Sequence, residues 1–290
     1  MEIVERYNEL LRTSENEAIK LLNRVLEGSF NRLVRRARVH IKAGQLDKAD
    51  RSAQLLQEFR QLIPVIRPDK VDGYDRIFRS LLTTSGKYGT TVAENLSSEI
   101  GLNRVDVAVP LEATYAAAAN ARGYLRKHGE KFATTSAEIV AQGIAEGRAT
   151  DEMVMDMRSR LGVVQSRAEV IVRTESLRAY NEASNNYYSA QGINTVMYYA
   201  TADDRSCPVC APRAGMIYKR SEIKTPLHPR CRCYLAPFDQ DLAVLDPEYN
   251  AMRLNHRAEV SEALKRYRDG SFSLNRAGVF EQLAPTPLVL

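Results

Sequence analysis

The sequence predicts a mainly α-helical protein with a small α+β module, bearing cysteine and histidine residues, near the C-terminal third. Apolar residues recur at the three- and four-residue spacing of amphipathic helices over most of the chain. Residues 194–201 (NTVMYYAT) break this pattern with the β-branched and aromatic side chains typical of a strand. All four cysteines fall between Cys207 and Cys233, after this strand. The module is therefore expected where the cysteines gather.

Length and composition limit the class of protein. A chain of 290 residues predicts two domains or one elaborated domain. A chain of this length can bury a hydrophobic core without disulfide bonds. No apolar run approaches the roughly 18 residues that span a bilayer, so a transmembrane protein is excluded, and no secretory signal is expected. The net charge of +5 is compatible with nucleic-acid binding but does not require it.

An N-terminal helical region is expected over residues 1–65. Apolar residues from Ile3 to Val25 follow one helical stripe, which favours intramolecular core over a partner surface, and Gly28 is the expected stop. A basic helical stretch up to Gly44 and a helix over 46–63 complete the region. Two prolines in residues 64–68 then break the pattern and place a boundary at about 64–69.

A helical middle region is expected over residues 66–134, with further helices in the segment that follows. Pro110 suits a first helical position, Gly129 a stop, and Thr135 and Ser166 each open a capping box. A short strand is expected at residues 105–109. The predicted helices cover residues 75–82, 91–100, 110–128, 135–147, 150–161 and 166–190.

The last third combines strands, a helix and a tail. Residues 194–201 and 215–218 are predicted strands. A C-terminal region over residues 239–290 begins its helix at Asp246-Pro247-Glu248 and continues to about Arg268. The apolar, proline-containing tail Leu283–Leu290 is a candidate docking strand for another subunit.

The cysteines and one histidine have the spacing of a metal site. Cys207-x-x-Cys210 is followed, after 17 residues, by His228-x-x-Cys231-x-Cys233. Zinc takes four thiolate or imidazole ligands in a tetrahedron, so structural zinc held by four of these five residues is the favoured interpretation. Two alternatives stay open. One is a disulfide joining the first pair to the second, and the other is reduced thiols packed as small apolar groups.

Further residues around the cluster form a specific pattern. They are Arg173-Thr174-Glu175, Asn181, Asp203, Arg205, Cys207, Cys210, Gly215, Pro226, His228, Pro229, Cys231, Arg232 and Cys233. On these residues, over 135–238, the chain resembles the phage head morphogenesis family, the minor head proteins similar to the phage Mu F protein. The family often has a Trp on the strand before the Asp, where this chain has Met197-Tyr198-Tyr199.

The resemblance implies a structural protein of the virion head, made in the host cytoplasm. It implies partners in the portal protein and the major capsid protein, a place at the portal vertex or head interior, and a role in genome packaging or delivery. Arg173, Glu175, Asp203 and Arg205 would then be structural, and Arg173 is expected to clamp helix to loop by pairing with a carboxylate such as Asp203. The alternative is that Arg173 and Glu175 lie on a solvated face.

The sequence does not favour an enzyme. It contains no GxSxG, P-loop, GxGxxG or HExxH motif. A thiol nucleophile with a histidine base would also place Cys and His together, but metal-ligand spacing explains His228 and Cys231 more simply.

The basic helical stretch is the candidate contact for DNA or for an acidic partner. Its arginines spread over about half of a helix surface, so any phosphate contact would be non-specific and sensitive to salt. An ordinary solvated helix face is the alternative. A factor that binds DNA during packaging or ejection is the second functional interpretation. The residues are Arg32, Arg35, Arg36 and Arg38.

Overall fold

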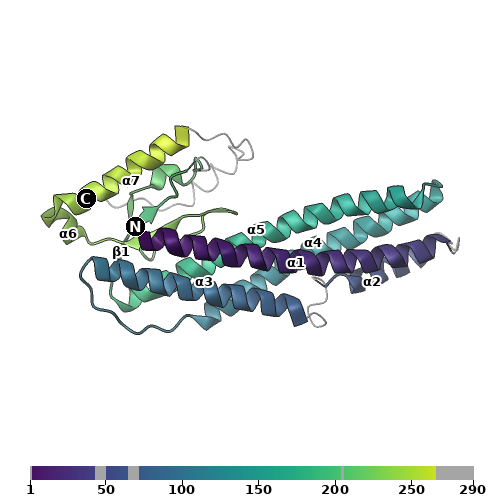
Figure 1. Ribbon diagram of the computed structural model, residues 1–290, viewed down its shortest axis with the longest axis horizontal. Helices are drawn as coiled ribbons and strands as arrows, with labels where there is room; N and C mark the ends of the chain where they lie inside the picture. The colour runs from purple at the N-terminus through teal and green to yellow at the C-terminus, as the bar shows by residue number, and fades with distance from the viewer. Residues whose placement is uncertain (1, 43–49, 65–71, 204–205, 266–290) are drawn as a thin grey trace. The chain divides into compact units, whose positions relative to one another are not determined.

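The computed structural model describes residues 2–42, 50–64, 72–203 and 206–265. It confirms a mostly helical protein with one small antiparallel sheet (Figure 1). The elements are α1 (Glu2–Lys42), α2 (Asp50–Leu62), α3 (Asp72–Glu99), α4 (Leu111–Ala145), α5 (Thr150–Ala190), β1 (Thr195–Tyr199), the 3₁₀ turn η2 (Ala211–Arg213), β2 (Ile217–Lys219), β3 (Tyr234–Pro237), α6 (Gln240–Leu245) and α7 (Pro247–Lys265).

The chain divides into two compact units built from non-contiguous segments. Unit 1 contains residues 1–11, 83–114 and 176–290, and unit 2 contains residues 12–82 and 115–175. No helix in the described ranges is long and apolar enough to cross a membrane. The division at residues 65, 134 and 238 expected from the sequence stays a prediction.

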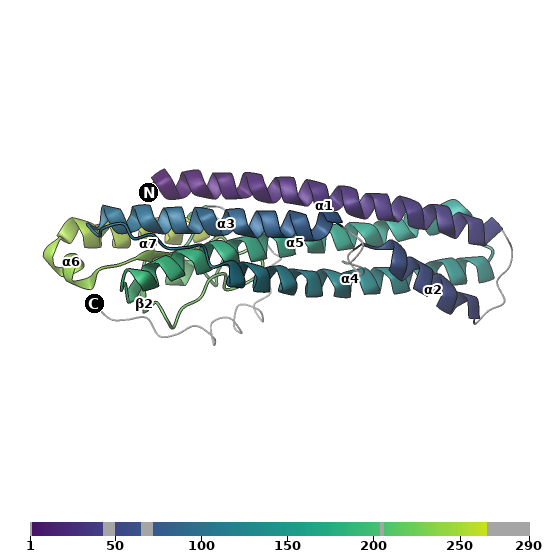
Figure 2. The same ribbon diagram turned by 90° about the horizontal axis from the view of Figure 1, so that it is seen from below.

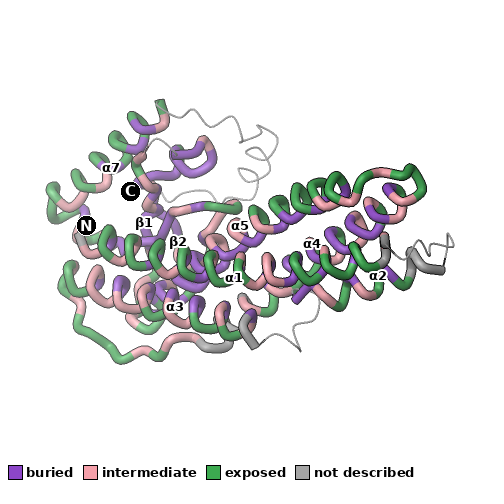
Figure 3. Tube along the Cα trace, turned by 45° about the vertical axis from the view of Figure 1, so that its right-hand side comes forward, coloured by how far each residue is buried: buried purple, intermediate pink, exposed green. Residues whose placement is uncertain are grey.

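Unit 2 is helical, and its core consists of the apolar faces of five helices. In α1 the buried side chains include Ala18 and Leu22, which confirms that this part of the N-terminal stripe is core, and Phe30 and Leu33 continue the buried face beyond it. Helix α2 lies beside α4 (Figure 2), where Arg60 Nε is 2.8 Å from Glu130 Oε2. Figure 3 shows the alternation of buried and exposed residues along these helices that their amphipathic sequences predict.

Several predicted helix ends are wrong because the helices continue through them. Gly28 lies inside α1 and Gly129 inside α4, and buried Phe30 and Phe132 continue the apolar faces beyond them. A glycine inside a helix costs only about 1 kcal/mol, which burial of such side chains exceeds. The two capping boxes likewise lie inside α4 and α5. The predicted helices 75–82 and 91–100 are one helix, as are 110–128 and 135–147, and 150–161 and 166–190. Gly44 and residues 46–49 lie outside the described part of the chain.

The sheet belongs to unit 1 and has the order β2-β1-β3, with both neighbours antiparallel to β1. Strands β1 and β2 confirm the two strands predicted after α5. The third strand was not predicted, because all four residues of β3 are buried and show no polar alternation. The strand expected at 105–109 is wrong. This segment is an irregular connection in which the Val105 N–H donates to Tyr187 Oη at 3.3 Å.

Helix α7 covers the sheet through an aromatic stack. The ring of His256 lies 3.7 Å from that of Tyr199, and Tyr199 stacks on Tyr234 at 4.5 Å. The His256 side chain is only 3% exposed, and neither ring nitrogen has a hydrogen-bond partner among the described residues. The helix begins at Pro247 as the sequence predicts. Its predicted end at Arg268 and the tail Leu283–Leu290 lie outside the described residues.

We expect His256 to make the protein sensitive to acid. Burial lowers its pKa from 6.5 to about 4, so the unfolded chain takes up a proton on this side chain at a higher pH than the folded protein does. Stability attributable to His256 should therefore be constant above pH 6.5 and fall as the pH drops toward 4. His256→Phe keeps a stacking ring that does not titrate. Between pH 7 and pH 4 both proteins should lose stability. The loss in the free energy of unfolding should be about 2 kcal/mol smaller for this variant than for the wild type. Equal losses in urea titrations at the two pH values would contradict this assignment.

Candidate metal centre

The first half of the site is the turn that follows β1. The backbone N–H groups of Cys210 and Ala211 donate to Cys207 O at 3.2 and 2.9 Å, which closes a tight turn. The Cys210 N–H also lies 3.4 Å from Cys207 Sγ. The C-x-x-C segment thus directs both sulfurs to one side, and η2 leads from it toward β2.

Gly215 holds this turn against α7. Its backbone has a φ of +69°, which glycine adopts without strain. A Cβ at this position would lie 2.7 Å from Arg253 O of α7, and Arg253 Nη1 donates to Gly215 O at 3.1 Å. The glycine of the sequence pattern is therefore required both by conformation and by close helix packing.

The second half of the site lies between β2 and β3. The Cys231 N–H donates to His228 O at 3.1 Å, and Cys233 directly precedes β3. His228 Nδ1 lies 2.9 Å from Pro229 O, so an Nδ1–H donated to this carbonyl places the lone pair that can bind a metal on Nε2.

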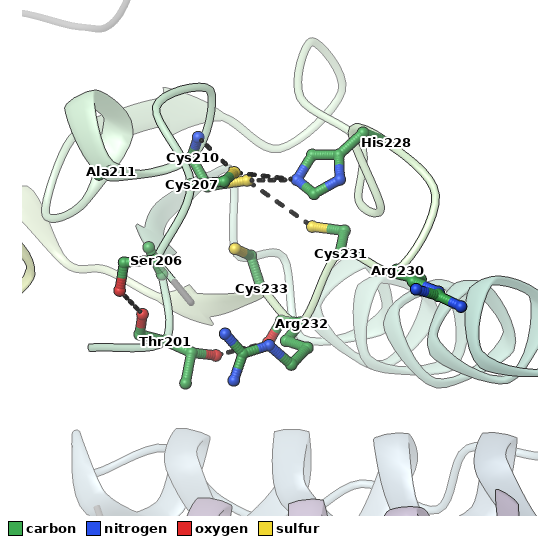
Figure 4. A pocket seen from close by; sticks show the side chains of 11 residues that line it. Thr201, Ser206, Cys207, Cys210, Ala211, His228, Arg230, Cys231, Arg232 and Cys233 are labelled. Carbon is green, nitrogen blue, oxygen red and sulfur yellow. Dashed lines mark hydrogen bonds between the residues drawn. The ribbon is translucent and has the colours of Figure 1, made fainter. Parts of the chain in front are cut away.

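The five predicted residues come together as one buried cluster (Figure 4). His228 Nε2 lies 3.1 Å from both Cys207 Sγ and Cys210 Sγ, and Cys210 Sγ lies 3.8 Å from Cys231 Sγ. Two groups that could hold a metal ion share Cys210: one with Cys207 and His228, the other with Cys231 and Cys233. A cavity of about 20 Å³ lies among these residues, enough for one particle the size of a water molecule.

The donor set fits zinc. Sulfurs bound at about 2.3 Å to a tetrahedral zinc lie about 3.8 Å apart, which matches the separation of Cys210 and Cys231. A disulfide would need about 2.05 Å, and all four cysteines are free thiols. The structure thus gives no support to the predicted disulfide alternative.

The pKa values within the cluster move in opposite directions. Hydrogen bonds from Cys210 and then from His228 lower the pKa of Cys207 to about 5, against the effect of burial. Burial lowers the pKa of His228, but the hydrogen bonds and charges of Cys207 and Cys231 outweigh it and raise that pKa to about 10. Cys207 is therefore stabilised as a thiolate, the form in which cysteine binds a metal.

A charged pair beside the cluster accounts for the aspartate of the sequence pattern. Arg232 makes a two-pronged contact with Asp203: Nη2 donates to Oδ1 at 2.6 Å and Nη1 donates to Oδ2. Ser206 Oγ donates to Thr201 O at 2.6 Å, and Thr201 Oγ1 donates to Arg232 O at 3.0 Å. These bonds fix the loop before Cys207 to the segment between Cys231 and Cys233. Arg205 lies outside the described residues.

The predicted pairing of Arg173 with Asp203 is wrong. Arg173 instead bonds to Glu15 Oε2 at 2.9 Å and to Glu169 Oε1 at 3.1 Å, within unit 2. Asp203 pairs with Arg232 because Arg232 lies on the adjoining loop. Glu175 is buried, so Glu175 is not part of a solvated face.

Asn181 connects α5 to the cluster, a role that its place in the sequence pattern did not reveal. Its Nδ2 donates to Cys233 O at 3.2 Å and to Leu177 O at 3.0 Å. Tyr198 was also missed as a site residue: it is fully buried, and its hydroxyl donates to Cys210 Sγ at 3.3 Å. Its position in a predicted strand next to the cysteines was the available signal.

The four arginines of the basic stretch all lie exposed on α1 in unit 2. Arg36 Nε pairs with Glu58 at 3.1 Å, and Arg38 Nη2 pairs with Asp151 at 2.9 Å. Arg32 donates to Ser29 Oγ at 3.1 Å. Two of the four charges are therefore compensated by carboxylates, and contact of this stretch with DNA stays a prediction.

Comparison with known families settles the origin of the pattern. Residues 135–236 match the family described as phage Mu protein F like protein. This segment is a Mu F-like domain. The matched segment contains the whole Cys/His cluster, β1, β2 and nearly all of β3. The match confirms the resemblance to the phage head morphogenesis family that the sequence motif indicated. No curated protein and no solved structure gave a significant match to the chain.

The Asp203–Arg232 pair in this Mu F-like domain offers a direct test of local stability. Asp203→Asn keeps the shape of the side chain but removes its charge, and should lower the free energy of unfolding by about 1–2 kcal/mol because the pair is two-pronged and partly buried. Asp151→Asn is the matched control, since Asp151 is 84% exposed in its pair with Arg38 and should cost less than about 0.5 kcal/mol. Equal losses in chemical denaturation would argue against a structural role for Asp203.

Proposed function

We propose that this chain is a structural minor head protein of a tailed phage, which acts in head assembly by binding rather than by catalysis. The observation that carries the proposal is the family match over the segment that forms the buried Cys/His cluster. The portal protein and the major capsid protein are the proposed partners, at the portal vertex or the head interior. A role in genome packaging or delivery belongs to the same proposal.

The cluster is proposed to be a structural zinc site. Cys207, Cys210, His228 and Cys231 are the proposed ligands, because the short contacts of His228 Nε2 and Cys210 Sγ connect these four residues. Cys233 is the fifth donor, and its sulfur lies below Cys207 and Cys210 and beside Cys231 in Figure 4. The bound ion would join the turn after β1 to the segment before β3. Its chemistry would be structural, since all four positions around it would be taken by protein donors.

The test is the composition and assembly of phage heads. Purified heads should contain the chain in far fewer copies than the major shell protein. A phage lacking the gene should accumulate incomplete heads, and a plasmid copy of the gene should restore complete ones. A Cys210→Ser copy should fail to restore them, whereas a Cys233→Ser copy should succeed. Normal heads without the gene, or absence of the chain from purified heads, would overturn the proposal.

A further inference from the structure

One face of unit 2 gathers positive charge without compensation. Lys127, His128 and Lys131 follow the three- and four-residue spacing of a single face of α4. The chain turns back after α4, and α5 runs antiparallel to it. Arg167 of α5 lies near His128. The two lysines and Arg167 are exposed, and His128 is half-buried between them.

The charges around His128 confirm that these side chains lie close together. The pKa of His128 is lowered by burial, then by the positive charges of Arg167, Lys127 and Lys131. Within the described part of the chain, no carboxylate offsets this lowering of the pKa. Seven arginines elsewhere in unit 2 each pair with an acidic side chain, namely Arg36, Arg38, Arg60, Arg122, Arg148, Arg158 and Arg173.

No ion pair or hydrogen bond engages the side chains of Lys127, Lys131 or Arg167 within the described ranges. Grouping like charges in this way raises the energy of the folded protein, so an external anion would be stabilised there. The guanidinium of Arg167 can grip two oxygens of one phosphate, and each lysine can act as a point charge on a neighbouring phosphate.

Exposed apolar side chains border the same charges. Tyr124 precedes Lys127 on the same face of α4 and is 56% exposed, and Val163 precedes Arg167 on α5 and is 52% exposed. A tyrosine ring beside lysines and arginine is the combination that stacks on bases or packs against sugars while cations hold the phosphates. An acidic protein surface would use the same cations, and the test below separates it from nucleic acid.

We infer that this basic face, consisting of Tyr124, Lys127, His128, Lys131 and Arg167, binds the phosphate backbone of nucleic acid without sequence specificity. The inference goes beyond the proposed structural role in the head and does not depend on it. It also moves the expected DNA contact from α1, where Arg36 and Arg38 are already paired, to the α4–α5 face of the same unit.

The test compares two charge reversals of equal size in the full-length protein. Lys127→Glu, Lys131→Glu and Arg167→Glu together remove the proposed phosphate contacts. Arg24→Glu, Arg32→Glu and Arg35→Glu make the same change in net charge on exposed positions of α1. Binding of a short fluorescent DNA duplex of mixed sequence is followed by anisotropy over a range of salt concentrations. Circular dichroism and thermal melting show that both variants remain folded.

The basic-face variant should bind the duplex at least about tenfold more weakly, with a salt slope smaller by about 2–3, because each phosphate contact contributes about 0.9 to that slope. The α1 variant should lose less than threefold, and its slope should stay near that of the wild type. Tyr124→Ala should weaken binding of single-stranded DNA more than binding of the duplex. Lys127→Gln with Lys131→Gln gives the same test with less perturbation of folding.

Three results would overturn the inference. The first is equal weakening in both triple variants, which would mean that net charge alone drives binding. The second is a wild-type protein that does not bind DNA at low salt. The third is tighter binding to polyglutamate than to DNA, lost only in the basic-face variant, which would assign the face to an acidic protein instead.

Discussion

Removal of zinc should unfold the module around the Cys/His cluster. Protein purified under reducing conditions should contain one zinc ion per chain. A strong chelator should then lower the free energy of unfolding by at least about 4 kcal/mol, or the melting midpoint by about 10 °C. The reason is physical: without the ion, the buried thiolates lose the positive charge of the metal, and the turn after β1 loses its bonds to the segment before β3. Metal analysis and calorimetry before and after chelation measure both quantities.

Single substitutions separate the proposed ligands from the fifth donor. Cys210 contacts both His228 and Cys231, so Cys210→Ser should abolish stoichiometric zinc and reproduce the unfolding caused by the chelator. Cys233→Ser is the matched control and should retain about one zinc per chain. Loss of zinc in Cys233→Ser with retention in Cys207→Ser would show that the other group, which consists of Cys210, Cys231 and Cys233, holds the metal. Full stability of Cys210→Ser without zinc would contradict a structural role for the ion.

Adding a methyl group at Gly89 should destabilise the protein nearly as much as removal of zinc. Helices α3 and α5 approach each other there within unit 1, and a Cβ on Gly89 would lie 2.0 Å from Tyr180 O and 2.8 Å from the carbonyl carbon. Backbone cannot move aside as a flexible side chain can. Ser184 Oγ also donates to Gly89 O at 2.9 Å, so separating the helices would break this bond. We expect Gly89→Ala to lower the free energy of unfolding by about 3 kcal/mol or more.

Gly123 provides the matched control for this substitution. It also lies inside a helix, but no atom lies within 4 Å of a Cβ placed on it. Gly123→Ala should therefore raise stability by about 0.5–1 kcal/mol through the better helix propensity of alanine. Denaturant unfolding of both variants measures the difference. A neutral Gly89→Ala would mean that the two helices pack less closely than described here.

The fold class could be predicted from the sequence because helical spacing and a β-branched segment are local signals. The helix ends could not. Gly28 and Gly129 are ordinary stop residues by local rules, but the buried faces on either side of them continue, and packing outweighs the small cost of a glycine. Strand β3 was missed for a related reason, since full burial removes the alternation that identifies a strand.

The clustering of the four cysteines with His228 could be predicted because C-x-x-C and H-x-x-C spacing is typical of metal sites. Their neighbours were harder to predict. Asp203 was placed in the pattern, but its pairing with Arg232 was not predicted. Arg232 lies in the segment before β3, and only the antiparallel register of β1 with β3 brings it beside Asp203. The same holds for Asn181, whose bond to Cys233 O depends on how α5 lies against the strands.

The strand order β2-β1-β3 has a consequence for the time course of folding. The outer strand β3 pairs with β1 across the long segment that contains β2. Closing a loop of this length costs entropy before any contact between β1 and β3 forms. An ion held between the turn after β1 and the segment before β3 would close most of this loop in one event. Metal supply during synthesis would then set how quickly the sheet forms, in addition to how stable it is once complete.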